Sequence, residues 1–313
     1  MILQQPQWTT RPASASIANA SSELAAIIAR HAPEDGERSP LSSIHLGRAS
    51  MPTRPMHVLY EPAFVVVAQG QKHVVLAGKE LVYDRTAYLL SSVALPITGR
   101  VTTASPTEPY LSVRIPLPPA LVGSVLANAE LPRARGAEQA SAKGLDVRPL
   151  DLPLLDAVVR LVRLVDAPAH APVLAPLVLQ EIVYRLLVGG QAARLQHIAI
   201  VGGRSHRMAR AIAWIRKNFD QPMRIEQLSK LLGMSPSGLH LHFRAVTGMS
   251  PLQYQKTLRL QEARRLMLAE YLDAATAGFR VGYNDPSQFT REYRRHFGAP
   301  PLQDISRIRL SAD

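Results

Sequence analysis

The sequence contains no cysteine, and this absence excludes several kinds of chemistry at once. Disulfide scaffolds, thiolate zinc sites, cysteine nucleophiles and thiol redox switches all need a residue that the chain does not have. Aromatic residues are also scarce, at 5% of 313 residues. No long uninterrupted apolar run is present, because the most apolar stretch, residues 172–190, contains Gln180, Glu181 and Arg185. That stretch is therefore a poor candidate for a membrane-spanning helix.

Other signals are missing as well. Residues 1–30 lack the basic start and apolar run of a secretory signal, so we expect a cytoplasmic protein with no membrane partner. No Gly-rich phosphate loop, Gly-x-Ser-x-Gly elbow or His-Glu-x-x-His motif occurs. His240 and His242 lie two residues apart on an expected helix and would point to different faces. We therefore expect no metal, no cofactor and no catalytic residue.

Positive charge is abundant and unevenly distributed. The chain has 36 Lys and Arg against 24 Asp and Glu, a net charge of +12. Residues 204–313 hold 18 basic and 9 acidic residues, whereas residues 1–203 hold 18 and 15. Three quarters of the surplus thus lies in the last third of the chain. A basic surplus concentrated in one region indicates a polyanionic partner such as nucleic acid.

The composition changes along the chain in a way that predicts two domains. Residues 1–40 are rich in Ser, Ala, Pro and charge and predict a loose lead-in, with room for a short helix at residues 24–30. Short β-branched or apolar runs separated by turn residues then predict a small antiparallel sandwich or barrel. The expected strands are residues 64–68, 72–76, 80–83, 87–90, 99–103 and 111–117.

Helical patterns follow the expected strands. Residues 155–162 and 174–187 predict two helices that either pack within the chain or form a dimer interface. The glycine pair Gly202-Gly203 marks a break, after which nearly all residues read as helical. We therefore expect an α+β protein with an antiparallel β domain plus helices at 41–200 and an all-α domain at 204–310.

The basic third contains an internal repeat with an offset of 50 residues. The matched pairs are Pro236 and Pro286, Ser237 and Ser287, Leu239 and Phe289, Phe243 and Tyr293, Arg244 and Arg294, Gly248 and Gly298, and Pro251 and Pro301. Two copies are too few for a solenoid. They indicate a duplicated supersecondary unit.

Each copy predicts two short helices joined by a glycine-containing turn, the helix-turn-helix arrangement. In the first copy, Gly233 ends one helix, Ser235 caps the next, and Gly248 ends it. In the second copy Gly282 takes the turn position, and Asn284 or Asp285 provides the cap. A helical bundle with a solvated basic surface is the alternative. The duplication, the repeated caps and the charge favour DNA binding.

These residues resemble the AraC/XylS family of bacterial transcription regulators. Residues 234–254 (MSPSGLHLHFRAVTGMSPLQY) are similar to the first unit of that family, 259–264 (RLQEAR) to its linker helix, and 281–283 (VGY) with 287–298 (SQFTREYRRHFG) to its second unit. Upstream, 60–62 (YEP), 67–70 (VAQG), 95–96 (LP) and 108–111 (EPYL) resemble its cupin-like N-terminal domain. The resemblance covers roughly residues 41–305.

The resemblance implies a sequence-specific regulator of promoter DNA. Two recognition helices would enter adjacent major grooves, the N-terminal domain would sense an effector or form a homodimer, and RNA polymerase would be a further partner. By position, the implied base-reading residues are Ser237, His240 and Leu241 in the first unit and Ser287, Gln288 and Arg291 in the second. Our candidates for phosphate contacts, which flank these helices, are Arg244, Lys256, Arg259, Arg294 and Arg295.

One position departs from the family. Leu241 stands where the family usually has a basic residue, and the repeat aligns it with Arg291. Arginine discriminates guanine by ~1–3 kcal/mol, whereas leucine offers only an apolar contact. We therefore predict that the second unit dominates sequence discrimination. The alternatives from other classes are a cupin-type metal-dependent enzyme with a basic helical appendage, and a small-molecule sensor that binds DNA without specificity.

Overall fold

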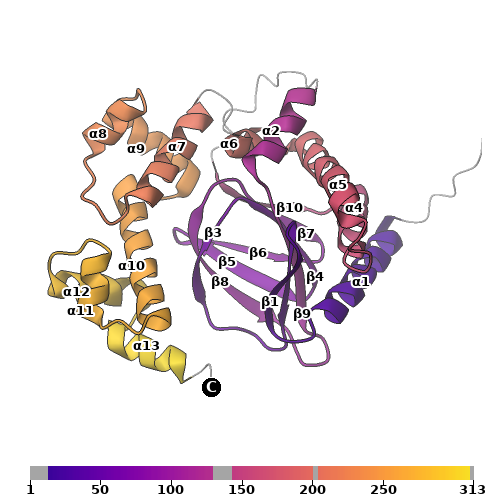
Figure 1. Ribbon diagram of the computed structural model, residues 1–313, viewed down its shortest axis with the longest axis horizontal. Coiled ribbons are helices and arrows are strands. Elements are labelled where there is room, and N and C mark those ends of the chain that lie inside the picture. Colours follow the sequence, from indigo (N-terminus) through magenta and orange to yellow (C-terminus); the bar gives the residue numbers. More distant parts are fainter. Residues whose placement is uncertain (1–12, 130–142, 200–203, 311–313) are drawn as a thin grey trace, which may run out of the picture.

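The computed structural model describes residues 13–129, 143–199 and 204–310. A strand-rich centre separates two groups of helices (Figure 1). Helices α1, α4 and α5 cover one side of the strands, and helices α7 to α13 lie on the other. This arrangement confirms the expected α+β class, with an antiparallel β domain followed by helices and a helical C-terminal part.

Ten described strands form two antiparallel sheets. They are β1 (Gly36–Leu41), β2 (Ile44–Ala49), β3 (Met56–Tyr60), β4 (Ala63–Gln69), β5 (Gln71–Leu76), β6 (Lys79–Asp84), β7 (Ala87–Ser91), β8 (Leu95–Thr103), β9 (Tyr110–Pro116) and β10 (Leu145–Pro149). The larger sheet has the order β1-β2-β9-β4-β7-β10, and the smaller one has the order β3-β8-β5-β6. All six expected strands occur, with shifted ends.

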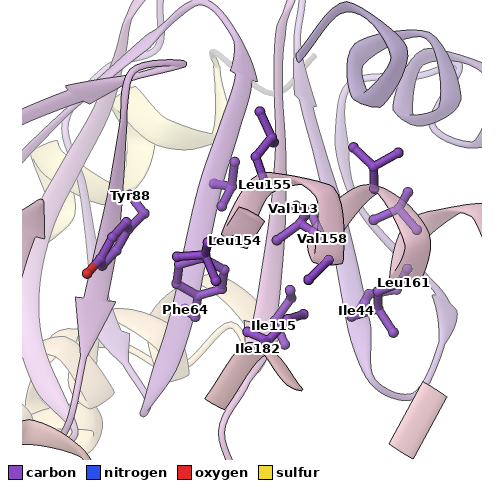
Figure 2. Close-up of a cluster of buried hydrophobic side chains, with 14 of the residues drawn as sticks. Ile44, Phe64, Tyr88, Val113, Ile115, Leu154, Leu155, Val158, Leu161 and Ile182 are labelled. Carbon is purple, nitrogen blue, oxygen red and sulfur yellow. The ribbon is translucent and has the colours of Figure 1, made fainter. Parts of the chain in front are cut away.

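The outer face of the larger sheet is covered by helices. These are α1 (Ala13–His31), α2 (Pro119–Asn128), α4 (Leu152–Arg163), α5 (Ala171–Leu186) and α6 (Ala192–Ala199). Figure 2 shows Phe64 and Val113 of the sheet beneath Leu155 and Val158 of α4. All four side chains are fully buried. This layer between the larger sheet and the helices is one of the two cores of the N-terminal half, and we call it the outer core.

Burial of both sheet faces corrects one expectation. The alternation in residues 111–115 suggested one buried and one exposed face. Instead Ser112 is buried and Arg114 is half-buried, because β9 lies inside the larger sheet with helices on one side and the smaller sheet on the other. Along β4, Phe64 and Val66 join the helix-covered core, while Val65 joins the core between the sheets.

The expected loose lead-in at 1–40 is wrong for its described part. Residues 13–31 form the 19-residue helix α1, whose Leu24 and Ile28 are completely buried in the outer core. The Ser and Ala content that suggested looseness instead lets α1 pack closely, and Ser21 is buried with them. Residues 36–41 form the edge strand β1, which is mostly exposed.

The long helical stretch at Ala171–Ala199 is apolar and long enough to cross a membrane by length and composition. One such helix is weak support for a membrane span, because core helices of soluble proteins pass the same test. Its Ile182 and Leu186 are fully buried in the outer core. A π-turn at Leu187–Gln191 joins α5 to α6, and Gly190 has a φ of 85° at this kink.

The C-terminal part consists of seven helices among the described residues. They are α7 (Arg204–Lys217), α8 (Ile225–Leu231), α9 (Pro236–Thr247), α10 (Pro251–Ala269), α11 (Ala274–Arg280), α12 (Pro286–Phe297) and α13 (Pro301–Arg309). The boundary near residue 200 stays a prediction, since Gly202-Gly203 lies outside the described residues.

The second core, which we call the inner core, contains residues from both sides of the expected domain boundary near residue 200. Val65, Val74 and Ile97 of the two sheets belong to the same buried cluster as Ile212 of α7 and Phe243 of α9. A second cluster in the C-terminal part, around Phe289 and Tyr293, contains no residue of the β domain. The first helix-turn-helix unit is therefore packed onto the β domain, whereas the second has its own core.

Candidate nucleic-acid interface

The first helix-turn-helix unit consists of α8 and α9. Gly233 in the turn between them has a φ of 61°, a left-handed conformation that glycine adopts most readily. The Ser235 side chain accepts a hydrogen bond from the Gly238 backbone N–H at 3.1 Å and caps α9. Leu239 and Phe243 are completely buried, which fixes the inward face of α9.

The second unit, α11 and α12, repeats this design with tighter packing at the turn. Gly282 has a φ of 89°, and a Cβ atom there would lie 1.9 Å from the backbone oxygen of Asp220. Asp285 caps α12 by accepting a hydrogen bond from the Ser287 N–H at 2.8 Å. Phe289 is completely buried beneath α12. Only glycine can therefore occupy the turn position in the present packing.

The predicted base-reading residues lie on the outward faces of the two second helices. On α9, Ser237 is exposed and Leu241 is 68% exposed, whereas His240 is half-buried. On α12, the exposed residues are Ser287, Gln288 and Arg291. These exposures hold with the β domain packed in place. The β domain thus leaves both outward faces open to a ligand.

A three-residue stripe recurs on the two helices with the spacing i, i+4, i+7. The stripe contains Ser237, Leu241 and Arg244 on α9 and Ser287, Arg291 and Arg294 on α12. All six residues are exposed. Among the described residues, none of the three arginines has a carboxylate partner within 4 Å, so their charge faces solvent. The α12 stripe is the more basic of the two.

Helix α10 links the two units, which lie at its opposite ends (Figure 1). From α10, Arg259 donates hydrogen bonds to the backbone oxygens of Phe219 at 2.6 Å and Gln221 at 3.0 Å, next to the first unit. The same guanidinium donates to the Gly282 oxygen at 2.9 Å, in the turn of the second unit. Arg259 therefore ties the two units together, and this geometry favours a positioning role over the phosphate contact we expected.

The other residues expected to contact phosphates differ in whether a carboxylate of the protein already pairs with them. Arg295 is exposed, like Arg244 and Arg294, without an ion pair among the described residues. Lys256 instead forms an ion pair with Glu292 of α12 at 2.9 Å. A phosphate would have to compete with that carboxylate. The freest candidate cations therefore belong mainly to α12.

The two adjacent arginines of α10, Arg264 and Arg265, both form ion pairs within the protein, which disfavours a role for them in binding nucleic acid. Arg265 pairs on the surface with Glu262 and Glu270. Arg264 forms an ion pair at 2.8 Å with Asp304, a fully buried carboxylate on α13. Asp304 also accepts a hydrogen bond from the Tyr293 hydroxyl at 2.9 Å. This buried cluster fastens α12 to α10 and α13.

Polar contacts fix the first unit on the β domain. The Tyr254 hydroxyl of α10 donates to the Ala94 carbonyl at 2.8 Å, and the Gly144 N–H donates to the carbonyl of Val246 in α9 at 2.8 Å. Arg216 of α7 forms an ion pair with Glu61. Together with the shared core, these contacts hold α7 and α9 in one orientation on the sheets.

The second unit contacts the β domain through one small aromatic cluster. The His57 ring of β3 packs edge-on against Phe297, with centroids 4.8 Å apart, and lies 5.1 Å from His296. Burial, followed by the charges of His296 and Arg264, lowers the pKa of His57 to about 4. His57 is therefore neutral in this contact at neutral pH, and protonation would disfavour the contact.

Sequence reasoning did not find the positioning residues. Arg259 carries no local mark that distinguishes it from a surface arginine, and its partners are backbone oxygens 40 and 23 residues away. Asp304 likewise pairs across 40 residues with Arg264. Helix α7 was expected only as one more helix, although its Met208, Ile212 and Ile215 belong to the core that the sheets share with α9. Only the tertiary packing reveals these roles.

The duplicated units, their caps and their open outward faces define a helix-turn-helix protein with an attached β domain. Residues 40–194 match the family model described as the AraC-type transcriptional regulator N-terminus, and residues 228–307 match a helix-turn-helix domain model. The two matches together cover most of the chain. The chain therefore belongs to the AraC/XylS family of transcriptional regulators.

Curated relatives agree over part of their length. The chain is similar to the HTH-type transcriptional regulator CdhR of Pseudomonas aeruginosa, with 28% identity over 147 residues, or 47% of this chain and 44% of that protein. It is also similar to the HTH-type transcriptional activator RhaS of Klebsiella pneumoniae, with 28% identity over 95 residues, or 30% of this chain and 34% of the activator. The chain thus matches less than half the length of these relatives.

Solved structures support the fold over nearly the whole chain. The structure of ToxT from Vibrio cholerae with a bound unsaturated fatty acid aligns with a TM-score of 0.53 and 10% identity, covering 86% of this chain and 96% of ToxT. At this identity the likeness concerns the fold alone. It shows the same combination of a β domain and a C-terminal helix-turn-helix domain.

Proposed function

We propose that this protein regulates transcription by binding a specific promoter site with α9 and α12 in adjacent major grooves. The observation that carries the proposal is the pair of capped helices, 50 residues apart in sequence, whose outward faces stay exposed while the β domain is packed beneath one of them. Adjacent major grooves on one side of a duplex are about 34 Å apart. Helix α10 is the spacer that would set the separation of the two helices.

Within this proposal the side chains divide into three roles. Ser237, His240 and Leu241 on α9 face the bases of one groove, and Ser287, Gln288 and Arg291 on α12 face those of the next. Arg244, Arg294 and Arg295 contact phosphates, with Lys256 available if Glu292 releases it. Arg259 holds the spacing of the two helices through its backbone contacts. Phosphate contacts supply affinity and register, and base contacts supply specificity.

The enzyme alternative has no support from the relatives, which are transcriptional regulators. Among the described residues, no three His, Asp or Glu side chains lie close enough together to hold a metal ion. Because the relatives are transcriptional regulators, we assign no catalytic residue. The proposal further holds that the protein acts in the cytoplasm, on double-stranded DNA and in contact with RNA polymerase.

The test is selection of bound duplexes from random DNA with the full chain. We expect one enriched site made of two short elements about one helical turn apart, bound about 10³-fold more tightly than unrelated duplex. Neutralising the three or four phosphates contacted by Arg244, Arg294 and Arg295, with or without Lys256, predicts that log K falls with log salt with a slope of about −3 to −4. Binding without sequence preference, or a slope near zero, would contradict the proposal.

Dimerisation through α5 is part of the same proposal. Exposed apolar side chains line one face of this helix, with Val173 69%, Leu177 58% and Tyr184 50% exposed. Their spacing of four and seven residues places them on one stripe. Leu174 and Val188 beside this stripe are also exposed, at 42% and 55%. An exposed apolar face of this kind fits the self-complementary contact of a two-fold dimer.

Sedimentation analysis tests the dimer. Leu177→Glu places a charge in the middle of the stripe and should convert a dimer into monomers without changing the folded β domain. Met51→Glu is the matched control, because Met51 is also 65% exposed but lies far from α5 in the chain. A monomeric wild type, or a dimer that survives Leu177→Glu, would assign the stripe another role.

A further inference from the structure

One carboxylate on α12 is shared by the second helix-turn-helix unit and the linker helix. Glu292 forms an ion pair through its Oε1 with Lys256 of α10 at 2.9 Å. Its Oε2 accepts a hydrogen bond at 2.8 Å from the hydroxyl of Tyr283, which lies in the turn between α11 and α12. The Glu292 side chain is only 20% exposed. Both carboxylate oxygens are therefore bound to other elements, and the carboxylate is held in one orientation.

The tyrosine that binds this carboxylate is itself fixed. Tyr283 is buried, and its ring packs edge-on against Phe289 of α12 with centroids 5.3 Å apart. The Arg259 guanidinium lies 5.8 Å from the same ring and donates a hydrogen bond to the carbonyl of the adjacent Gly282 at 2.9 Å. The Tyr283 hydroxyl is therefore a rigid anchor for Glu292.

The predicted base-reading residue Gln288 lies one helical turn before Glu292. A separation of four residues is the spacing at which side chains meet on one face of a helix. Burial raises the pKa of the Glu292 carboxyl, but its hydrogen bonds, including the one with Gln288, lower the pKa by more. The carboxylate is therefore ionised at neutral pH and can only accept hydrogen bonds. The group of Gln288 that faces it is the amide nitrogen.

This contact determines what Gln288 offers to a ligand. With one N–H directed at Glu292, the carbonyl oxygen and the second N–H of the exposed Gln288 amide stay free. An acceptor beside a donor matches adenine, which presents its N6 donor and N7 acceptor in the major groove. Guanine presents two acceptors there, and the carbonyl oxygen of the held amide would face one of them.

The first unit lacks this arrangement. The repeat aligns Gln288 with Gly238 and Glu292 with His242. Helix α9 nevertheless has the same length as α12, a side-chain cap at its start and a left-handed glycine at its end. A helix-turn-helix unit thus forms without a carboxylate at this position. The role of Glu292 therefore concerns what α12 alone presents at its surface.

We propose that Glu292 is a positioning residue that holds the Gln288 amide in the orientation that reads adenine. The reading of a base rests on the proposed function, whereas the orientation of the amide is a property of the free protein. Lys256 belongs to the same positioning group, because it holds the Glu292 carboxylate and stays on it when DNA is bound. The second unit then owes its specificity to a fixed amide as well as to Arg291.

Nitrogen-15 relaxation of side-chain amides in the full chain without DNA tests the orientation. The Gln288 signal is assigned by its loss in Gln288→Ala. We expect an ordered amide in the wild type and a mobile one in Glu292→Gln, whose neutral amide both donates and accepts and so allows Gln288 two orientations. Glu262→Gln is the matched control, with the same charge change at a carboxylate that pairs with Arg265. Equal mobility in the wild type and Glu292→Gln would overturn the proposal.

Competition between duplexes tests the reading of adenine. In the selected site, Gln288→Ala identifies the base pair whose preference depends on Gln288. There the wild type and Glu262→Gln should prefer adenine over guanine by at least about fivefold. Glu292→Gln should bring this preference towards parity and keep the preference at the pair read by Arg291. Loss at both pairs would indicate a merely structural role. An unchanged preference in Glu292→Gln, or a wild-type preference for another base, would also overturn the proposal.

Lys256→Met separates the holding of Glu292 from a phosphate contact. We expect a weaker adenine preference and a salt dependence equal to that of the wild type. A slope of log K against log salt that is shallower by about 0.9 would place Lys256 on a phosphate and refute its role in holding Glu292. A wild type that selects no DNA site would refute the proposed function, whereas the relaxation measurement without DNA would still decide whether Glu292 orients Gln288.

Discussion

The two helix-turn-helix units have the same backbone plan but different surroundings. In the first unit Leu239 and Phe243 pack into a core shared with the sheets, whereas Phe289 and Tyr293 of the second unit pack into a core without residues of the β domain. Their outward faces differ too, because Leu241 on α9 stands where α12 has Arg291. The two units therefore share a backbone shape but differ in the core that their inward faces join and in the side chains that their outward faces expose.

This difference suggests a division of labour. The first unit is packed on the β domain and has the less basic outward stripe, so it is suited to report the state of that domain. The second unit carries more free arginines and touches the β domain mainly through His57, so it is suited to grip DNA. Arg259 connects the two roles, because it donates hydrogen bonds to the backbone just before the first unit and to the turn of the second.

The largest expected effect concerns the separate core of the second unit. Asp304→Ala removes a buried carboxylate that Arg264 and Tyr293 contact, and leaves both without their partner. Breaking a buried ion pair in this way costs about 3–5 kcal/mol. Urea unfolding followed by circular dichroism should show an early transition from the second unit, with the remaining helices unfolding as in the wild type.

Trp214 provides the internal control for this prediction. It lies on α7 and packs against the shared core, so its fluorescence reports the first unit and the β domain. In a Trp8→Phe background, the Trp214 transition should stay where it is in the wild type. Asp273→Ala, which removes only the exposed cap of α11, should cost about 1 kcal/mol. A Trp214 transition that moves together with the second unit would refute the independence of the two cores.

The turns of the two units give the next contrast. Gly282→Ala forces a Cβ atom to within 1.9 Å of the Asp220 oxygen, so the backbone must move. Gly233→Ala meets no atom within 4 Å and suffers only its left-handed φ, a cost of about 1–2 kcal/mol. We expect thermal midpoints to fall clearly further for Gly282→Ala. Equal losses would mean that the close approach at Asp220 relaxes without cost.

These comparisons show what the sequence could predict. Caps are local, and they correctly placed both units, because Ser235 and Asp285 accept hydrogen bonds from backbone groups two or three residues away. The strand pattern located six of the described strands for the same reason. Exposed edge strands such as β1, and long-range partners such as Arg259 with Gly282, have no local pattern. Their positions depend on packing that a single sequence does not display.

The outward faces should differ in DNA binding. Arg291→Ala should weaken binding to the selected site by about 1–3 kcal/mol and relax the preference at one base pair. Leu241→Ala should change the affinity by less, since leucine contributes only an apolar contact. Measuring both variants against the selected site and an unrelated duplex separates base reading from charge loss. Equal losses from the two substitutions would contradict the weaker role of the first unit.

The smallest expected effect is a pH dependence of the contact between the second unit and the β domain. The pKa of His57 in the folded chain is about 4, below the ordinary value of 6.5. Burial is the largest cause, the charges of His296 and Arg264 lower the pKa further, and the charge of Asp304 opposes them. The unfolded chain therefore binds a proton more readily, and stability is lost as pH falls from about 6.5 towards 4. The contact between His57 and Phe297 should loosen in this range.

Hydrogen exchange measured at pH 7 and pH 5, corrected for intrinsic rates, tests where the loosening occurs. Exchange in α12 should increase at pH 5, while α9 should remain protected because its seat on the β domain is an apolar core. His57→Gln should reduce the difference for α12 without abolishing it, because burial also lowers the pKa of His296 in the same contact. His197→Gln is the control, since burial also lowers the pKa of His197 to about 4, but this residue lies on α6. Equal loosening of α9 and α12 would mean that acid acts on the whole C-terminal part. The two units would then not differ in the pH dependence of their contacts with the β domain.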